Sequence, residues 1–266
     1  MEKLGNEAGN NHPNNREENV LGYKRVSELE NPSLIISPDE ERYKPTSVGE
    51  DFVVHGTYKE IFSNLDLTDK KIANVGAGYP LGRNNILREL GDLSPKAILI
   101  PVDIEEILTQ IWSLIDSNSE NNDDLKLRPV TADATKMPFA DNSLDGYIST
   151  NLVNVPGVKH REFFIQKLFS EAFSILKEGG FILISSFGYF KYSRDGKFIK
   201  YNNKINSDQI VTLERLGQLL SEAGFKKIEK LPVDTESVKN YEQIKDSDEV
   251  DMEVEIIECG GYLAFK

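Results

Sequence analysis

Several features that mark common protein classes are scarce in this sequence of 266 residues. It has one cysteine, Cys259, which rules out an intramolecular disulfide and agrees with a reducing cytoplasm. Its three histidines are scattered, so no metal-binding motif is expected. No apolar run approaches the roughly 20 residues of a membrane span, and the polar start lacks the apolar segment of a secretory signal. We therefore expect a soluble, cytoplasmic protein with no membrane association.

Positive charge is also in deficit. Against 44 aspartates and glutamates the chain has 31 lysines and arginines, which gives a net charge of −13. The average field repels polyanions, so nucleic acid is an unfavourable partner, although a local basic patch is not excluded. Much of the excess acid lies in residues 234–258, which we interpret as a solvated loop or edge element.

Composition separates the start of the chain from the rest. Residues 1–20 are polar and rich in asparagine and glutamate, which predicts a disordered tail. Residues 21–65 contain several prolines and only short apolar stretches before a helical pattern that ends near Leu65, so they form a predicted N-terminal extension. Residues 66–266 are expected to form the main domain.

Strands and helices alternate in the main domain. Short apolar runs predict strands at residues 71–75, 97–102, 127–131, 144–149, 181–185, 226–231 and within 254–265. Helical patterns lie at residues 84–90, 105–115, 163–176 and 213–223. This alternation predicts an α/β fold with a doubly wound, mostly parallel sheet that closes on an antiparallel hairpin. A ligand is expected at the carboxyl ends of the strands, near the switch in strand order.

The first of these strands runs into a glycine-rich turn that contains Gly76, Ala77 and Gly78. The two glycines lack a Cβ, so the turn can be tight and its amides can face a ligand near the start of a helix. A strand-to-helix turn without a ligand is the alternative. The turn alone therefore predicts a nucleotide-like ligand only weakly.

Two carboxylates follow neighbouring strands. Asp103, next to Ile104, ends the second strand, where a carboxylate can accept hydrogen bonds from both hydroxyls of a ribose; an N-cap for the next helix is the alternative. Asp133, next to Ala134, follows the third strand and could accept a hydrogen bond from an adenine amino group. A loop or capping role is the alternative for Asp133.

These motifs together resemble the class I, Rossmann-like S-adenosylmethionine-dependent methyltransferases over roughly residues 71–187. The glycine turn is similar to the family's cofactor loop, and Asp103 to its acidic residue after the second strand. Residues 137–148, which read MPFADNSLDGYI, resemble the segment leading into the family's fourth strand and are the most specific match. The resemblance implies a seven-stranded sheet in the order 3-2-1-4-5-7-6, with the last strand antiparallel and helices on both faces.

The resemblance also implies the cofactor, S-adenosyl-L-methionine, and the residues that bind it. By position these are Asn74, Gly76, Ala77, Gly78, Asp103, Ile104, Asp133, Ala134 and Asn151. The chain departs from the family's pattern in two respects. Asn74 stands where an acidic residue is common, although its carbonyl can still accept a bond from an amino group, and Tyr79 and Pro80 stand where a third glycine is common. N-terminal additions in this family often form a lid, which is a possible role for residues 21–65.

Methyl transfer requires little beyond alignment of donor and acceptor. If the acceptor must lose a proton, His160 is the candidate base, with a helix cap or a solvated side chain as the alternatives. We predict transfer to a small-molecule acceptor. RNA or protein methylation is an alternative in which the aromatic and basic residues 187–204 form the contact surface; a β-hairpin turning at Asp195 and Gly196 is the favoured structure for that segment.

Two further alternatives have specific motivations. A catalytically silent S-adenosylmethionine-binding regulator would explain the departures at Asn74 and Pro80. Hydride transfer with a dinucleotide fits less well, because Leu81 stands where the third glycine of G-x-G-x-x-G belongs. The C-terminal edge strand could pair with a second subunit, so a homo-oligomer is possible. The sequence does not determine the oligomeric state.

Overall fold

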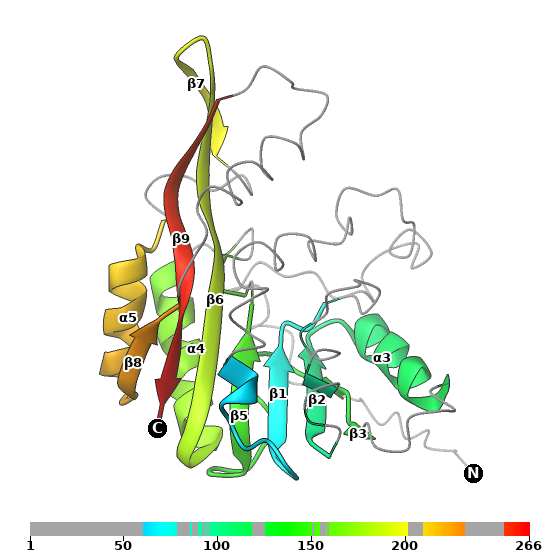
Figure 1. The fold of residues 1–266 in the computed structure, drawn as a ribbon. Coiled ribbons are helices and arrows are strands. Elements are labelled where there is room, and N and C mark those ends of the chain that lie inside the picture. Colours follow the sequence, from blue (N-terminus) through cyan, green and yellow to red (C-terminus); the bar gives the residue numbers. More distant parts are fainter. Residues whose placement is uncertain are drawn as a thin grey trace, which may run out of the picture.

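The fold is taken from a computed structural model of the chain (Figure 1). The structure describes residues 61–78, 86, 90–91, 94, 96–118, 126–150, 152–154, 158, 160–201, 210–231 and 253–266. The predicted tail at residues 1–20, most of the extension at residues 21–65 and most of the helix predicted at residues 84–90 lie outside the described residues.

The described residues form one sheet whose central strands are parallel. Its strands are β1 (Lys71–Val75), β2 (Ile98–Asp103), β3 (Lys126–Leu127), β4 (Val130–Thr131), β5 (Leu144–Ser149), β6 (Leu176–Arg194), β7 (Lys197–Tyr201), β8 (Lys226–Lys230) and β9 (Glu253–Phe265). The order is β3-β2-β1-β5-β6-β9-β8, with β4 beside β2 and β7 beside β6. Strand order reverses between β1 and β5, which marks the carboxyl ends of these strands as the expected ligand position.

This order confirms the predicted 3-2-1-4-5-7-6 arrangement. The closing strand β9 is antiparallel to both β6 and β8, as predicted. The strand predicted at residues 127–131 is instead two short pieces, β3 and β4, which flank Arg128 and Pro129. Proline has no N–H to donate to a neighbouring strand, so the ladder with β2 is interrupted there.

The fifth predicted strand is far longer than the apolar run at residues 181–185. β6 has 19 residues, and beyond Ser185 it continues with β9 as an arm past the carboxyl edge of the sheet (Figure 1). The arm turns back into β7 through Asp195 and Gly196, whose φ values of 52° and 69° suit a type I′ turn. The predicted hairpin at these two residues is confirmed. Residues 177–180, which lie between the helix and the strand predicted from the sequence, belong to β6 and form an irregularity in its pairing with β5.

Helices cover both faces because successive residues of each buried strand point to opposite sides. Ala73 and Ile182 pack in the core cluster that includes residues of α4 (Arg161–Ile175) and α5 (Leu213–Glu222). Ile72 and Leu183 pack in the second cluster, which includes a residue of α3 (Glu106–Asn118). The apolar stripe of α5, with leucines at 213, 216, 219 and 220, has the spacing of one helix face.

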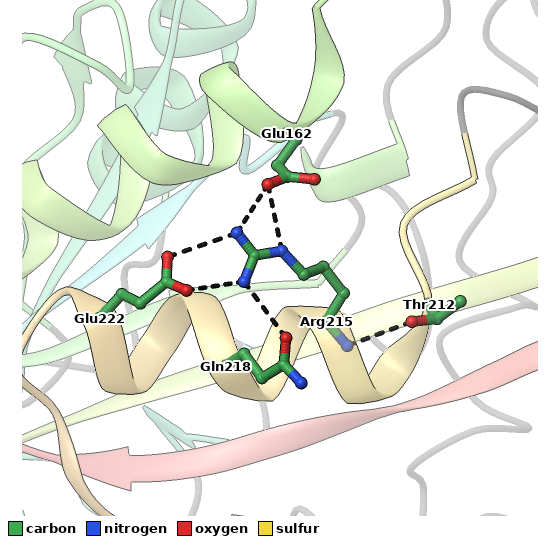
Figure 2. A network of polar contacts seen from close by, with 5 residues as sticks. All are labelled: Glu162, Thr212, Arg215, Gln218 and Glu222. Carbon is green, nitrogen blue, oxygen red and sulfur yellow. Dashed lines mark hydrogen bonds and ion pairs between the residues drawn. The ribbon is translucent and has the colours of Figure 1, made fainter.

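A charged network joins α4 to α5, as Figure 2 shows. The Arg215 guanidinium donates through Nη2 to Glu162 Oε1 at 2.7 Å and through Nη1 to Glu222 Oε1 at 2.7 Å. Thr212 caps α5 by accepting from the Arg215 backbone N–H at 3.1 Å. The network holds the first turn of α4 against α5, and that turn directly follows His160.

At the amino edge of the sheet, Asp145 connects three strands. Its Oδ2 accepts from the backbone N–H of Lys71 at 3.0 Å, and its Oδ1 accepts from Lys177 Nζ at 2.9 Å, with Lys70 Nζ at 3.7 Å. Burial raises the pKa of Asp145, but the Lys71 N–H and the two lysines outweigh it, so the pKa is lowered overall. The ionised carboxylate therefore stabilises the folded protein.

Replacing Asp145 with alanine should lower the free energy of unfolding by about 1–3 kcal/mol, because the Lys71 N–H loses its acceptor. The stabilisation by Asp145 is fully present above the ordinary aspartate pKa of about 3.9 and is lost as the pH falls through the lowered value. Urea unfolding of both proteins at neutral and acid pH measures this. Equal stability at neutral pH would contradict the prediction.

Candidate functional site

The glycine turn lies at the carboxyl end of β1. Gly76 and Gly78 have φ values of 71° and 59°, in the left-handed region that favours glycine. A Cβ placed on Gly76 would lie 3.3 Å from Leu152 Cδ1, whereas a Cβ on Gly78 would meet no heavy atom within 4 Å among the described residues. As far as the described residues go, the backbone at Gly78 is therefore open to an approaching ligand.

The amides of this turn are bonded within the protein. The N–H groups of Gly76 and Ala77 both donate to Val102 O, at 2.9 and 3.0 Å, and the Gly78 N–H donates to Asp103 Oδ2 at 2.9 Å. They therefore do not face a ligand, contrary to the expectation from the sequence. The reason is that the turn folds across the end of β2, where a carbonyl and a carboxylate are available as acceptors.

Asp103 joins the turn to the next helix. Besides the Gly78 N–H, its carboxylate accepts from the Glu105 N–H at 3.1 Å, just before α3 begins, and its backbone carbonyl accepts from the Ala132 N–H at 2.9 Å. Burial raises the pKa of Asp103, although hydrogen bonds from Gly78, Glu105 and Ile104 oppose the rise. Asp103 is not the N-cap of α3, which begins at Glu106, but its carboxylate binds the backbone just before that helix and also holds the glycine turn.

Trp112 contacts the turn from α3. Its indole Nε1 donates to Gly78 O at 3.1 Å, and the side chain is only 4% exposed. Gly78 is thus held through its N–H by Asp103 and through its carbonyl by Trp112. Sequence reasoning missed Trp112, because an isolated tryptophan in a helical pattern carries no motif.

Buried oxygen atoms lie near the carboxyl ends of β1 and β5. Asn74 is 3% exposed and Ser149 is 1% exposed, and neither Asn74 Oδ1 nor Ser149 Oγ has a hydrogen-bond partner among the described residues. Their strands are adjacent, since Asn74 pairs with Ile148. A buried oxygen without a partner costs about 1–3 kcal/mol, so such atoms mark where a ligand or water would bind.

Asp133 stabilises its own loop. Its Oδ1 accepts from both the backbone N–H and the hydroxyl of Thr135, each at 2.8 Å, and its carbonyl accepts from the Lys136 N–H at 3.0 Å. The loop role considered for this residue is therefore present, and the adenine role stays a prediction. Ala134 is half-buried and packs against the core cluster that includes Ala73.

The segment after β5 contains the two remaining predicted residues. Asn151 lies outside the described residues. His160 is exposed at the N-cap of α4, and its side chain makes no capping hydrogen bond. Its neighbour Arg161 is 4% exposed and donates through Nη1 to Val153 O at 2.7 Å, which holds the short helix η4 (Leu152–Asn154). The role of His160 as a base stays a prediction.

The opposite edge of the sheet has a cavity of its own, of about 450 Å³, whose lining includes Lys70, Asp145, Lys177 and Phe265. It lies at the amino ends of the strands, away from the glycine turn. No group of three or more His, Cys, Asp or Glu residues in the described part of the chain could hold a metal ion. Within that same part, no helix combines the length and apolarity needed to cross a membrane.

Comparison with protein families matches residues 77–184, from the glycine turn into β6, to a family described as a methyltransferase domain. No curated protein matches the chain.

Three solved structures illustrate the likeness of the fold. A SAM-dependent methyltransferase from Aquifex aeolicus is 14% identical, covers 89% of this chain and 98% of its own, and has a TM-score of 0.50. A putative sarcosine dimethylglycine methyltransferase from Galdieria sulphuraria is 17% identical, with coverages of 85% and 88% and a TM-score of 0.50. A phosphoethanolamine N-methyltransferase 2 from Haemonchus contortus, in complex with S-adenosyl-L-methionine, is 16% identical, with coverages of 86% and 59% and a TM-score of 0.53.

Proposed function

We propose that this chain is a class I S-adenosylmethionine-dependent methyltransferase that transfers a methyl group to a small-molecule acceptor. Its residues 77–184 match a methyltransferase domain, and its strand order is the one expected for that fold. S-adenosyl-L-methionine is accordingly its cofactor. One observation carries the proposal: an open glycine turn is bonded to the Asp103 carboxylate where the strand order reverses. Ligands of this fold class bind at that place in the sheet.

The residues at the site suit each part of this cofactor. Asn74 Oδ1, a buried acceptor with no partner in the described part of the chain, can accept from the amino group of the methionine moiety. The Gly78 backbone, with no Cβ, allows close approach of the nucleoside. Asp103 Oδ2 accepts from the Gly78 N–H and Oδ1 from the Glu105 N–H, and a carboxylate has about four lone-pair sites, so acceptor capacity remains for a ribose hydroxyl. Asp133 uses one oxygen for its loop, so the other can accept from adenine.

Catalysis in this proposal rests mainly on orientation. The bound cofactor supplies a methyl group on a sulfonium, which is already a good leaving group. The protein holds the nucleoside at Gly78 and Asp103. The methyl acceptor would bind beside the segment after β5, where a hydrogen bond from Arg161 holds η4. Alignment of this kind contributes a large part of a rate enhancement. His160, exposed at the start of that segment's helix, is the candidate group for removing a proton from the acceptor.

The acceptor class is inferred from charge. A net charge of −13 opposes approach of RNA, which favours a small molecule over a nucleic acid. A silent S-adenosylmethionine-binding protein is the second candidate, because Asn74 supplies no negative charge to balance the cofactor's ammonium or sulfonium group.

Calorimetry with the full-length protein tests the cofactor. We expect both S-adenosylmethionine and S-adenosylhomocysteine to bind, and NAD to bind far more weakly. Formation of S-adenosylhomocysteine with a panel of small hydroxyl, amine and thiol compounds, with RNA and with protein as acceptors then tests transfer. Absence of binding to both cofactor forms would overturn the proposal, and tight binding without turnover on the whole panel would favour the silent alternative.

A further inference from the structure

The Gly78 backbone is held from both sides by side chains of the neighbouring β2 and α3 elements. Its N–H donates to Asp103 Oδ2 at 2.9 Å, and its carbonyl accepts from Trp112 Nε1 at 3.1 Å. These two bonds restrain the peptide groups on both sides of the Gly78 Cα. The orientation of the open backbone at this residue therefore depends on both side chains.

Among the residues that the structure describes, little else holds Gly78. It has no side chain, its φ is 59°, and no heavy atom of the described residues lies within 4 Å of the position a Cβ would take. A glycine explores more backbone conformations than any other residue, so an unrestrained turn here would lose entropy when a ligand orders it. Hydrogen bonds that order the turn beforehand remove that cost from binding.

Trp112 is well placed to provide such a restraint. It is 4% exposed and packs in the core cluster that includes Ile72, Leu99 and Leu127, so its ring position is set by the core. The helix that carries it is also linked to Asp103 through the Glu105 N–H at 3.1 Å. The two restraints on Gly78 thus come from the adjacent elements β2 and α3, and the hydrogen bond from the Glu105 N–H to Asp103 joins β2 to the residue just before α3.

We propose that Trp112 is a positioning residue, whose indole N–H holds the Gly78 backbone in the conformation that binds S-adenosylmethionine. The inference rests on the proposed function of this site and extends it to a residue outside the glycine and aspartate motifs. Trp112 acts through Gly78 and needs no contact with the reacting atoms. Its loss should therefore weaken cofactor binding without slowing the chemical step at saturating cofactor.

Trp112→Phe tests this, because phenylalanine keeps an aromatic ring in the core and removes the donor. The matched control is Tyr262→Phe, which also removes one aromatic side-chain donor to a backbone carbonyl, the 2.9 Å bond from Tyr262 Oη to Leu213 O. We expect Trp112→Phe to raise the calorimetric Kd for S-adenosylhomocysteine and the KM for S-adenosylmethionine about 2- to 10-fold, with kcat unchanged. Tyr262→Phe should leave all three unchanged. A kcat loss at constant KM, or equal Kd values in the two variants, would overturn the proposal.

Amide hydrogen exchange of ligand-free protein provides a readout that needs no cofactor. The Gly78 amide should exchange faster in Trp112→Phe than in the wild type or in Tyr262→Phe. Unchanged exchange would overturn the restraint. If wild-type protein binds neither cofactor form, the proposed function fails and the cofactor role of Trp112 with it, whereas exchange still decides whether Trp112 holds the turn.

A second measurement covers the case in which Trp112→Phe fails to fold. Trp112 is the only tryptophan in the sequence, so growth on an isosteric analogue with sulfur in place of the indole N–H changes this residue alone. The analogue should reproduce the weaker binding while the ring still fills the core. Full affinity in the analogue protein would reject the hydrogen bond as the cause.

Discussion

Replacement of Asp103 by alanine is expected to weaken binding of both S-adenosylmethionine and S-adenosylhomocysteine by about 30- to 300-fold. The variant loses the carboxylate proposed to bind the ribose, and the Gly78 N–H loses the acceptor that orders the turn at 2.9 Å. Hydrogen bonds to a charged group are each worth about 1.5–3 kcal/mol, and a tenfold change in Kd corresponds to about 1.4 kcal/mol. Isothermal titration calorimetry measures the change.

Asp145→Ala is the matched control for this substitution. Asp145 is also a carboxylate that accepts from a backbone N–H, at 3.0 Å, but it lies at the amino edge of the sheet. The Asp145→Ala protein should have a lower free energy of unfolding and an unchanged affinity for the cofactor. Wild-type affinity in a folded Asp103→Ala protein would reject the ribose assignment, and an equal loss of affinity in both variants would attribute the effect to general destabilisation.

Acid pH should reproduce part of the effect of Asp103→Ala. Burial raises the pKa of Asp103, so this group gains a proton before an ordinary aspartate does as the pH falls from neutral toward about 3.9. Protonation removes acceptor capacity, and affinity should fall over that range. The effect on stability has the opposite sign: the ionised carboxylate is disfavoured by folding, and that cost is relieved as the pH falls through the raised pKa. Asp103→Asn should flatten the pH dependence of binding.

Replacement of Gly78 by alanine is expected to weaken cofactor binding by more than about tenfold. The new methyl group would project into the open space beside the turn, where we place the nucleoside. The left-handed backbone, with φ of 59°, adds strain of about 1–2 kcal/mol for a residue with a side chain. Calorimetry and urea unfolding separate the loss of affinity from the loss of stability.

Gly196→Ala is a close control for the backbone strain. Gly196 has a φ of 69°, and its Cβ position also has no neighbour within 4 Å among the described residues, but it lies in the turn between β6 and β7. Both variants should lose similar stability, and only Gly78→Ala should lose cofactor affinity. Full affinity in Gly78→Ala would show that the open space beside this residue is not the nucleoside site.

Local pattern was enough to predict most of the architecture. Buried parallel strands read as short apolar runs, and their alternation with helices specified the doubly wound sheet that the strand order confirms. The length of β6 was not predictable in this way. Its extension pairs with a strand more than sixty residues away, as in the ion pair at 2.6 Å between Lys191 and Glu255, and such pairing leaves no short-range signal.

For the candidate site too, the sequence identified some features and missed others. Its motif residues were identified because a glycine turn and an aspartate after the next strand have mechanistic signatures in sequence. The hydrogen bonds that these residues make could not be identified from the sequence. The Gly76 and Ala77 amides donate to Val102 O, whereas the sequence suggested that they face a ligand.

By itself the sequence determined the alternation of strands and helices, the position of the glycine turn at Gly76 and Gly78, and the carboxylate at Asp103, because each follows from local periodicity and residue chemistry. The strand order came from the resemblance to a known family. Only the tertiary structure decided how Gly78 is held. The carboxylate of Asp103 and the indole of Trp112 meet its backbone after β1, β2 and α3 have packed together, and the Trp112 indole comes 34 positions further along the chain. Contacts of this kind depend on the three-dimensional path of the chain, which residue type and spacing do not encode.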